Sequence, residues 1–224
     1  KIKTANGNNY AESTKSDIKN AFKIYIKWRL GLEKAVKLTG WLDTKIPKKT
    51  PDFLTEEEVE VLYKSCRNAR ERFLIAVLFD TGARAEEFFN IRLEDIFLPN
   101  DSTSFVKIAI KEEYSKTNGR TISLYWKHSL EAVRDYVRER REQGIRPNEP
   151  IMKGDYNQAR ACRRRLGEVK LNKRVHFHLF RHSSATFLAS KLNRQQLCIR
   201  FGWAFSSDMP DVYISRAGME SKDL

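Results

Sequence analysis

The chain has 224 residues, 41% of them hydrophobic, and carries 42 Lys and Arg against 29 Asp and Glu, a formal net charge of +13 at pH 7. This length allows one substantial core plus a smaller unit, and the basic balance favours a polyanionic partner, with nucleic acid as the first candidate. Because the chain lacks any run of ~20 apolar residues and any secretory pattern, we expect no membrane partner and a cytoplasmic, nucleoid-associated location in a host cell.

The three cysteines, Cys66, Cys162 and Cys198, are far apart and show no CxxC spacing. This pattern favours reduced thiols over a disulfide framework or a zinc knuckle. The first residue is Lys1 rather than Met, so the sequence is expected to start inside a longer protein.

The first predicted element is a helix from Ser13 to about Leu38. Its apolar side carries Ile18, Phe22, Tyr25 and Trp28. A basic stripe recurs every fourth residue, at Lys15, Lys19, Lys23 and Lys27. We predict that this stripe contacts DNA phosphates, and a solvated surface is an equally weighted alternative. The segment 46–51 then contains two prolines, Pro47 and Pro51, and predicts an exposed linker and a domain boundary.

The next segment predicts a helix that begins at Thr55, because Thr55 and Glu58 have capping-box spacing. The nearly continuous apolar run from Phe73 to Phe79 predicts a central, buried helix that ends at Gly82. A short helix is expected over 83–90, which places Arg84 near a helix N-terminus, where anions bind readily.

A β-hairpin is predicted next, from Phe105–Ile110 and Thr121–Tyr125, with Asn118 and Gly119 as the turn signal and Lys116 near the tip. Further helices are expected over about 130–143, 157–166, 178–192, 194–201 and 210–217. The predicted fold class is therefore α+β, mainly α, with a small antiparallel β-hairpin or sheet insertion.

Three short motifs then occur in a specific order. The first is Thr81-Gly-Ala-Arg84-Ala-Glu-Glu87 with Leu93-Glu-Asp95 after it, the second is His178-Leu-Phe-Arg181, and the third is Phe201-Gly-Trp203 with Tyr213. In order and spacing these motifs resemble the TGxRxxE, HxxR and G-(H/W)…Y boxes of the tyrosine recombinase family, which includes phage, plasmid and archaeal integrases. The resemblance covers about Pro51 to Gly218.

The resemblance implies a tyrosine-recombinase-like catalytic domain over residues 51–224, preceded over residues 1–50 by a partial helical core-binding segment and linker. It also implies site-specific integration or excision through a 3′-phosphotyrosyl intermediate, with Tyr213 as the nucleophile. The energy of the cleaved phosphodiester is then stored covalently, so no cofactor, ATP or metal is expected.

The residue types suit this chemistry. Arg84 and Arg181 are expected to bind the phosphate bidentately, and His178 and Trp203 to donate to the same phosphate. Glu87, one turn after Arg84, is expected to orient that guanidinium. Lys116 resembles the general acid of the family, which protonates the departing 5′ oxygen.

Each assignment has a simpler alternative. Arg84 and Glu87 can form an ordinary surface ion pair, and Trp203 and Tyr213 can be packing residues. Lys116 can be an ordinary charged residue of the hairpin, because Lys111 and Arg120 lie nearby. His178 and His182 have the i, i+4 spacing of zinc ligands, and we predict that no metal binds there because no acidic or cysteine ligand is adjacent.

The densest basic cluster precedes the HxxR motif and is predicted to line the DNA channel, although charge runs are usually solvated surfaces. Its residues are Arg160, Arg163, Arg164 and Arg165, followed by Lys170, Lys173 and Arg174. The predicted partner is double-stranded DNA, and the family implies a homotetramer on paired sites. The segments before the linker and after Tyr213 are shorter than is usual in the family, so we expect a partial DNA clamp, and tetramer assembly by this fragment stays open.

Other functions remain open at this level. Type IB topoisomerases and telomere resolvases use the same phosphotyrosine chemistry. A catalytically inactive DNA-binding regulator on the same fold is a candidate from another class, although such a protein needs no tyrosine nucleophile. A metal-dependent nuclease is disfavoured because no Asp/Glu cluster is evident.

Overall fold

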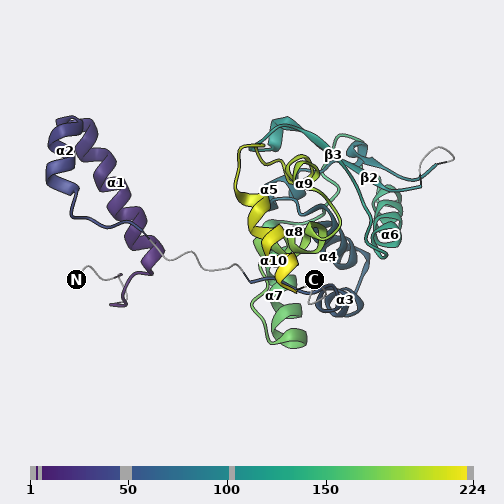
Figure 1. The fold of residues 1–224 in the computed structure, drawn as a ribbon. Coiled ribbons are helices and arrows are strands. Elements are labelled where there is room, and N and C mark those ends of the chain that lie inside the picture. Colours follow the sequence, from purple (N-terminus) through teal and green to yellow (C-terminus); the bar gives the residue numbers. More distant parts are fainter. Residues whose placement is uncertain (1–3, 5–6, 46–51, 101–103, 221–224) are drawn as a thin grey trace. The chain divides into compact units, whose positions relative to one another are not determined.

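The structure is a computed structural model that describes residues 4, 7–45, 52–100 and 104–220 (Figure 1). Contacts divide the chain into two compact units, Lys1–Thr50 and Pro51–Leu224. The proposed linker at 46–51 lies outside the described residues, so the predicted roles of the two units stay predictions. No helix in the described ranges is long and apolar enough to cross a membrane.

Over residues 7–45 the first unit contains two helices, α1 (Glu12–Leu30) and α2 (Leu32–Thr39), where the sequence predicted one. The single long helix was wrong because Gly31 adopts φ 80° and ψ 166°, which ends α1 and lets α2 pack against it. Ser16 donates a hydrogen bond to the carbonyl of Thr44, 2.7 Å away, and so fixes the returning chain on α1. The expected apolar side of α1 stays exposed, with Trp28 78% accessible.

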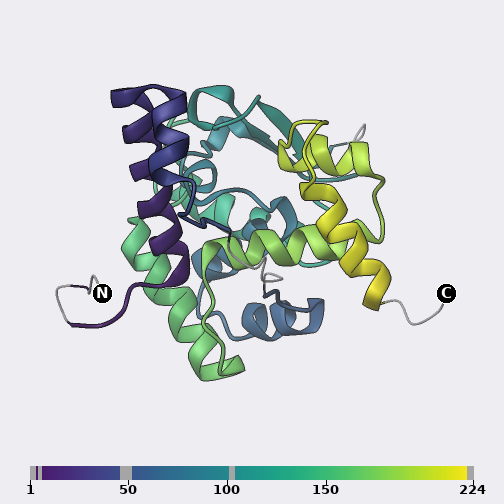
Figure 2. The same cartoon turned by 60° about the vertical axis from the view of Figure 1, so that its left-hand side comes forward.

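The second unit is mainly helical, and its helices occur where the sequence predicted them, with ends shifted by a few residues (Figures 1 and 2). The helices are α3 (Glu56–Lys64), α4 (Ala69–Thr81), α5 (Ala85–Phe89), α6 (Ser129–Glu142), α7 (Tyr156–Leu171), α8 (Phe177–Ala189), α9 (Arg194–Phe201) and α10 (Met209–Glu220).

Helix α4 is the centre of this unit, and α3, α6, α7 and α8 pack against it. Every residue from Phe73 to Thr81 is buried, as the apolar run predicted. The predicted capping box at Thr55 and Glu58 begins α3, and Gly82 ends α4 in the left-handed conformation, with φ 58°. A Cβ at position 82 would clash with the ring of Phe201, so this close approach requires glycine.

The predicted hairpin is present as β2 (Lys107–Ile110) and β3 (Arg120–Ser123), which pair antiparallel with Ile108 opposite Ile122. A third strand that the sequence did not predict, β1 (Ile96–Phe97), pairs with the other edge of β2. Asn118 and Gly119 do not form a two-residue turn. A nine-residue connection, 111–119, contains the short 3-10 helix η2 (Glu112–Tyr114) and carries Lys116.

The last three helices are consecutive in sequence and pack together. Helix α10 contacts both α8 and α9 (Figure 2), and a small apolar cluster that includes Leu188, Leu197, Phe201 and Tyr213 fills the space among them. Helix α9 also contacts β3, so the C-terminal helices, the hairpin and the end of α4 meet in one region. The three sequence motifs lie in this region.

Candidate active site

Arg84 lies at the start of α5, immediately after the turn at Gly82. Its backbone N–H donates to Glu87 Oε2 at 2.9 Å, and its Nη1 donates to Glu87 Oε1 at 2.9 Å. The Arg84 side chain is 23% exposed, whereas that of Glu87 is 1% exposed. Glu87 therefore fixes the arginine on the protein side and leaves part of the guanidinium accessible.

Arg181 connects the three motifs. From α8, its Nη1 donates to the carbonyl of Gly82 at 2.8 Å and its Nη2 donates to the carbonyl of Phe201 at 2.6 Å. Burial, together with the positive charge of Arg84, lowers the pKa of Arg181 to about 9, so the guanidinium remains charged at neutral pH. The two bonds fix its plane and leave other N–H groups for a ligand.

Glu87 has two further side-chain partners besides Arg84, namely Arg120 and Ser115. Its carboxylate accepts from Arg120 Nη1 and Nη2 at 3.2 and 2.8 Å and from Ser115 Oγ at 2.7 Å. Arg120 Nε also donates to the carbonyl of Arg200, 2.8 Å away. Burial opposes ionisation of Glu87, but the hydrogen bonds from Arg120 and its neighbours outweigh it and lower the pKa to about 2. Glu87 is therefore an ionised anchor for α5, the hairpin and, through Arg120, the end of α9.

Lys116 lies in the connection between β2 and β3, exposed to solvent. Its neighbours are fixed, because Ser115 bonds to Glu87 and the Thr117 N–H donates to Ser115 Oγ at 3.3 Å. The nearby Lys111 differs, since its Nζ lies 2.6 Å from Glu94 and 3.0 Å from Asp95, and these hydrogen bonds raise its pKa. Lys116 has no such carboxylate partner among the described residues.

Trp203 and Tyr213 form a ring stack at the end of α9. Their ring centroids are 5.5 Å apart with an interplanar angle of 3°, and Trp203 also stacks on Phe201 at 4.8 Å. The Arg181 guanidinium carbon lies 5.5 Å from the Trp203 ring centroid. Tyr213 is only 1% exposed, and burial raises the pKa of its phenol. The phenol is therefore protonated at neutral pH.

Two histidines of α8 complete the cluster. Burial and then the positive charges of Arg181 and Arg84 lower the pKa of His178. One turn later, His182 Nδ1 lies 2.6 Å from Tyr213 Oη, and the centroids of the two histidine rings are 5.7 Å apart. Among the residues described, no group of three His, Cys, Asp or Glu side chains is arranged to hold a metal ion.

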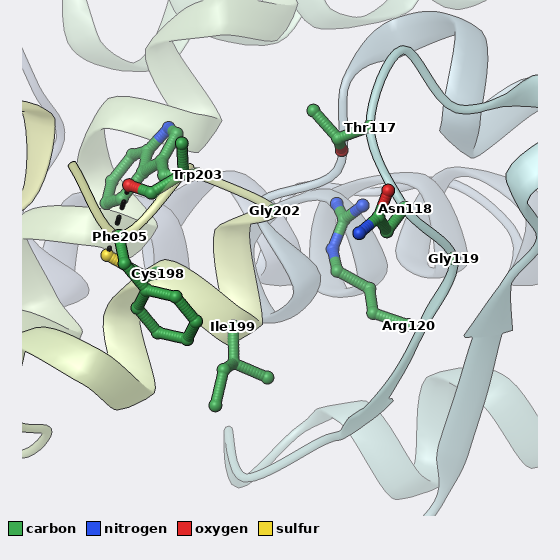
Figure 3. A pocket seen from close by; sticks show the side chains of 10 residues that line it. Thr117, Asn118, Gly119, Arg120, Cys198, Ile199, Gly202, Trp203 and Phe205 are labelled. Atoms are coloured by element: carbon green, nitrogen blue, oxygen red, sulfur yellow. Dashed lines mark hydrogen bonds between the residues drawn. The ribbon is translucent and has the colours of Figure 1, made fainter. Parts of the chain in front are cut away.

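A hollow of about 380 Å³ lies beside this cluster, between the hairpin connection and the end of α9 (Figure 3). Arg120 and Thr117 line one side, and Trp203, Gly202 and Phe205 line the other. At Gly202, with φ 62°, a Cβ would approach Thr117 Oγ1 to 2.5 Å. The glycine therefore lets the chain segment before Trp203 pass close to the hairpin that carries Lys116.

The structure thus brings the six predicted catalytic residues and Glu87 into one region of the second unit. The residues are Arg84, Glu87, Lys116, His178, Arg181, Trp203 and Tyr213. The sequence analysis did not assign two further residues of this region, Arg120 and His182. It treated Arg120 only as a neighbour of Lys116 and His182 only as a residue with zinc-like spacing. The position of His182 directly after Arg181 was the one signal in the sequence that could have identified it.

The predicted DNA-binding arginines of α7 fall into two groups. Arg160 is exposed, and Arg164 is 69% exposed beside Glu168. Arg163 instead is buried, donates to the carbonyl of Val175 and lies over the Phe177 ring at 4.4 Å. Arg165 donates to both carboxylate oxygens of Glu71. We therefore revise the prediction for Arg163 and Arg165, because their guanidinium groups hold α7 against the core.

The lysines of α1 also differ from one another. Lys15 pairs with Glu12 at 2.6 Å, and Lys19 donates to the carbonyl of Asp43 at 2.8 Å. Lys23 is partly exposed and Lys27 is exposed. Contact of this stripe with DNA stays a prediction, and its first two members are already engaged within their own unit.

Comparison with known proteins identifies the family of this chain. The model of the phage integrase family matches residues 52–217. A tyrosine recombinase of Thermosipho africanus is 28% identical over 156 residues, which are 66% of this chain and 51% of that protein. The chain therefore spans about half the length of this relative.

Solved structures share the fold. The crystal structure of XerA recombinase matches with a TM-score of 0.61 at 19% identity, over 96% of this chain and 78% of that one. The XerH site-specific recombinase, bound to its difH substrate before cleavage, matches with a TM-score of 0.59 at 24% identity, over 77% of this chain and 53% of that one.

Proposed function

This chain belongs to the phage integrase family, and we propose that it is a site-specific recombinase that cuts and rejoins double-stranded DNA through Tyr213. The observation that carries the proposal is that the three motifs meet at Arg181. Its guanidinium donates hydrogen bonds to the carbonyls of Gly82 and Phe201. It also lies beside the ring of Trp203, and that ring stacks on Tyr213. An arginine at the start of α5, an arginine and a neutral histidine from α8, and a tyrosine from α10 therefore share one site.

The arrangement suits phosphoryl transfer. Attack by a hydroxyl places negative charge on the non-bridging phosphate oxygens, and fixed guanidinium groups stabilise that charge without reorganisation. Arg84 and Arg181 supply these groups, and Glu87 and two backbone carbonyls hold them in place. His178 and the indole N–H of Trp203 supply further donors.

Lys116 is the proposed general acid for the 5′ leaving oxygen. Lys111 is bound to Glu94 and Asp95, and Arg120 to Glu87, so both rivals are engaged in structural contacts. An exposed amine on a connection that is tethered at Ser115 can approach a bound strand.

The proposed DNA contacts outside the site come from Arg160 and Arg164 of α7 and from Lys23 and Lys27 of α1. XerH is solved with its difH substrate, which supports a DNA partner for a chain of the same fold. The family also supports recombination by four protomers on paired sites, in which a 5′-hydroxyl from a partner duplex attacks the phosphotyrosyl bond.

The test uses a pool of duplexes of randomised sequence, each nicked so that cleavage releases a short 5′-hydroxyl fragment. Religation then lacks its nucleophile, and we expect a protease-sensitive adduct on the 3′ end in the presence of EDTA. Tyr213→Phe should bind the pool normally and give no adduct. An adduct with Tyr213→Phe, or cleavage that requires a divalent metal, would contradict the proposal.

A further inference from the structure

The phenol of Tyr213 must lose its proton when it attacks, and the groups discussed so far do not account for that proton. The pKa of Tyr213 is raised by burial, so the hydroxyl is protonated in the free protein. Within the described part of the chain, its hydrogen-bond partner is the imidazole of His182, with Nδ1 2.6 Å from Tyr213 Oη. The two rings lie 6.0 Å apart at 30°.

We propose that His182 is a further catalytic residue, whose Nδ1 accepts the phenolic proton of Tyr213 while the Tyr213 oxygen bonds to phosphorus. This inference rests on the proposed function. The bond from phosphorus to the 5′ oxygen breaks, and Lys116 supplies the proton of the released 5′-hydroxyl. His182 ends protonated and Lys116 neutral, so charge is conserved. In religation His182 returns the proton to the departing phenolate.

The surroundings of His182 keep it in the proton-accepting form. The charged and titratable groups that face the imidazole are His176, His178 and Arg181 on the α8 side and Tyr213 and Arg216 on α10. Burial, then His178 and the other positive neighbours, lowers the pKa of His182 to about 4. A bound phosphodiester brings negative charge close to the ring, which raises this pKa toward the range where a base is effective.

The geometry also fixes which histidine acts. His178 lies one turn earlier on α8 and faces the two arginines, whose charges contribute to its lowered pKa. His182 instead contacts the phenol directly and packs beside the stack of Tyr213 on Trp203. The two histidines therefore serve opposite ends of the reaction, the phosphate oxygens and the nucleophile.

The first experiment compares single-turnover adduct formation by the wild type and by His182→Asn, on the nicked pool, over a range of pH. The Asn Oδ1 can accept the phenolic hydrogen bond in place of Nδ1 but cannot take the proton. We expect cleavage about 100-fold slower, at the low end for loss of a general base. The wild-type rate should rise with pH and then level off, whereas the variant should lack that rise.

His176→Asn is the matched control, because Asn keeps the acceptor for the Leu179 N–H, now supplied by His176 Nδ1 at 3.0 Å. It should keep the rise of the cleavage rate with pH, and the midpoint of that rise should move only slightly upward, because burial and His178 lower the pKa of His182 more than His176 does. A 5′-bridging sulfur in the DNA should not restore the His182→Asn rate, because the defect lies at the nucleophile and not at the leaving group.

A second experiment keeps His182 and changes the phenol. Difluorotyrosine at position 213 is more acidic than tyrosine and needs a base less, so it should restore much of the rate in His182→Asn and change the wild type little. Equal cleavage rates for His182→Asn and the wild type at every pH would overturn the inference. So would a difluorotyrosine that changes the cleavage rate by the same factor in the wild type and in His182→Asn. Failure of the wild type to form any adduct would instead reject the proposed function.

Discussion

The guanidinium of Arg120 binds both carboxylate oxygens of Glu87, with N–O distances of 3.2 and 2.8 Å, although the two residues are 33 positions apart. Both side chains are almost fully buried, at 4% and 1% exposure. Because Glu87 also binds Arg84 and Ser115, one carboxylate holds the first arginine proposed to bind phosphate and the base of the Lys116 connection. The relative positions of Arg84 and the Lys116 connection therefore depend on a single carboxylate, that of Glu87.

Glu87→Gln should destabilise the second unit, because it leaves Arg120 buried without its counter-charge. The folded-state pKa lies below the ordinary value of 4.5, at about 2, so the stabilisation is complete above about 4.5 and is lost as pH falls toward 2. The lowered pKa corresponds to a stability loss on the order of 3 kcal/mol near pH 7. Urea unfolding at several pH values measures it.

Glu86→Gln, on the exposed side of the same helix, is the control for this experiment and should unfold like the wild type. If Glu87→Gln were as stable as Glu86→Gln near neutral pH, the Glu87 carboxylate would not stabilise the second unit as inferred.

Lys116→Ala should slow cleavage about 100-fold through loss of leaving-group protonation. A substrate with a bridging 5′-sulfur at the scissile phosphate should restore much of the rate, because a thiolate leaves without a proton. Lys111→Ala is the matched control, since its amine is bound to Glu94 and Asp95. If the sulfur substrate restored the cleavage rate of Lys111→Ala and not that of Lys116→Ala, Lys111 would be the general acid.

Arg84→Ala should leave DNA binding nearly unchanged and reduce cleavage at least about 100-fold, because its guanidinium is required for the charge that develops in the transition state. Arg84→Lys should recover little of this, since an ammonium group cannot reproduce the forked contact to Glu87 and a phosphate. Gel-shift and adduct assays on the same DNA separate the two effects. Equal losses in binding and cleavage would speak against a transition-state role.

Arg164→Ala should weaken binding to all DNA sequences by a similar factor and reduce the slope of log K against log salt by about 1, as expected for one lost phosphate contact. The control is Arg138→Ala on α6, which is 73% exposed against 69% for Arg164. The two helices lie on opposite sides of the second unit in Figure 1. If both variants had the same slope of log K against log salt, Arg164 would not contact a phosphate and α7 would not be part of the DNA-binding surface.

His182 should make the stability of the second unit depend on pH. Its folded-state pKa of about 4 lies below the ordinary 6.5, so the unfolded chain binds more protons between these values. The stabilisation from the neutral ring is therefore complete above about 6.5 and is lost as pH falls toward 4. His182→Asn should show a smaller fall in unfolding free energy over this window. Identical pH profiles would mean that the ring is not held neutral.

Local patterns in the sequence determined the helices, the β-hairpin and the order of the three motifs, since helical periodicity, a capping box and a glycine C-cap act within a few residues. The same patterns misjudged the segment around Gly31, where a backbone conformation ended one helix and started another.

Tertiary structure decided the rest, because contacts between distant residues depend on how the elements pack and on where their side chains point. The sequence grouped Arg163 with Arg164, yet one side chain is buried and the other lies in solvent, since adjacent helical positions face different directions. Likewise, His182 and Tyr213 are 31 residues apart and meet only because α8 packs against α10. The motifs supplied the candidate residues, and packing determined which atoms contact one another.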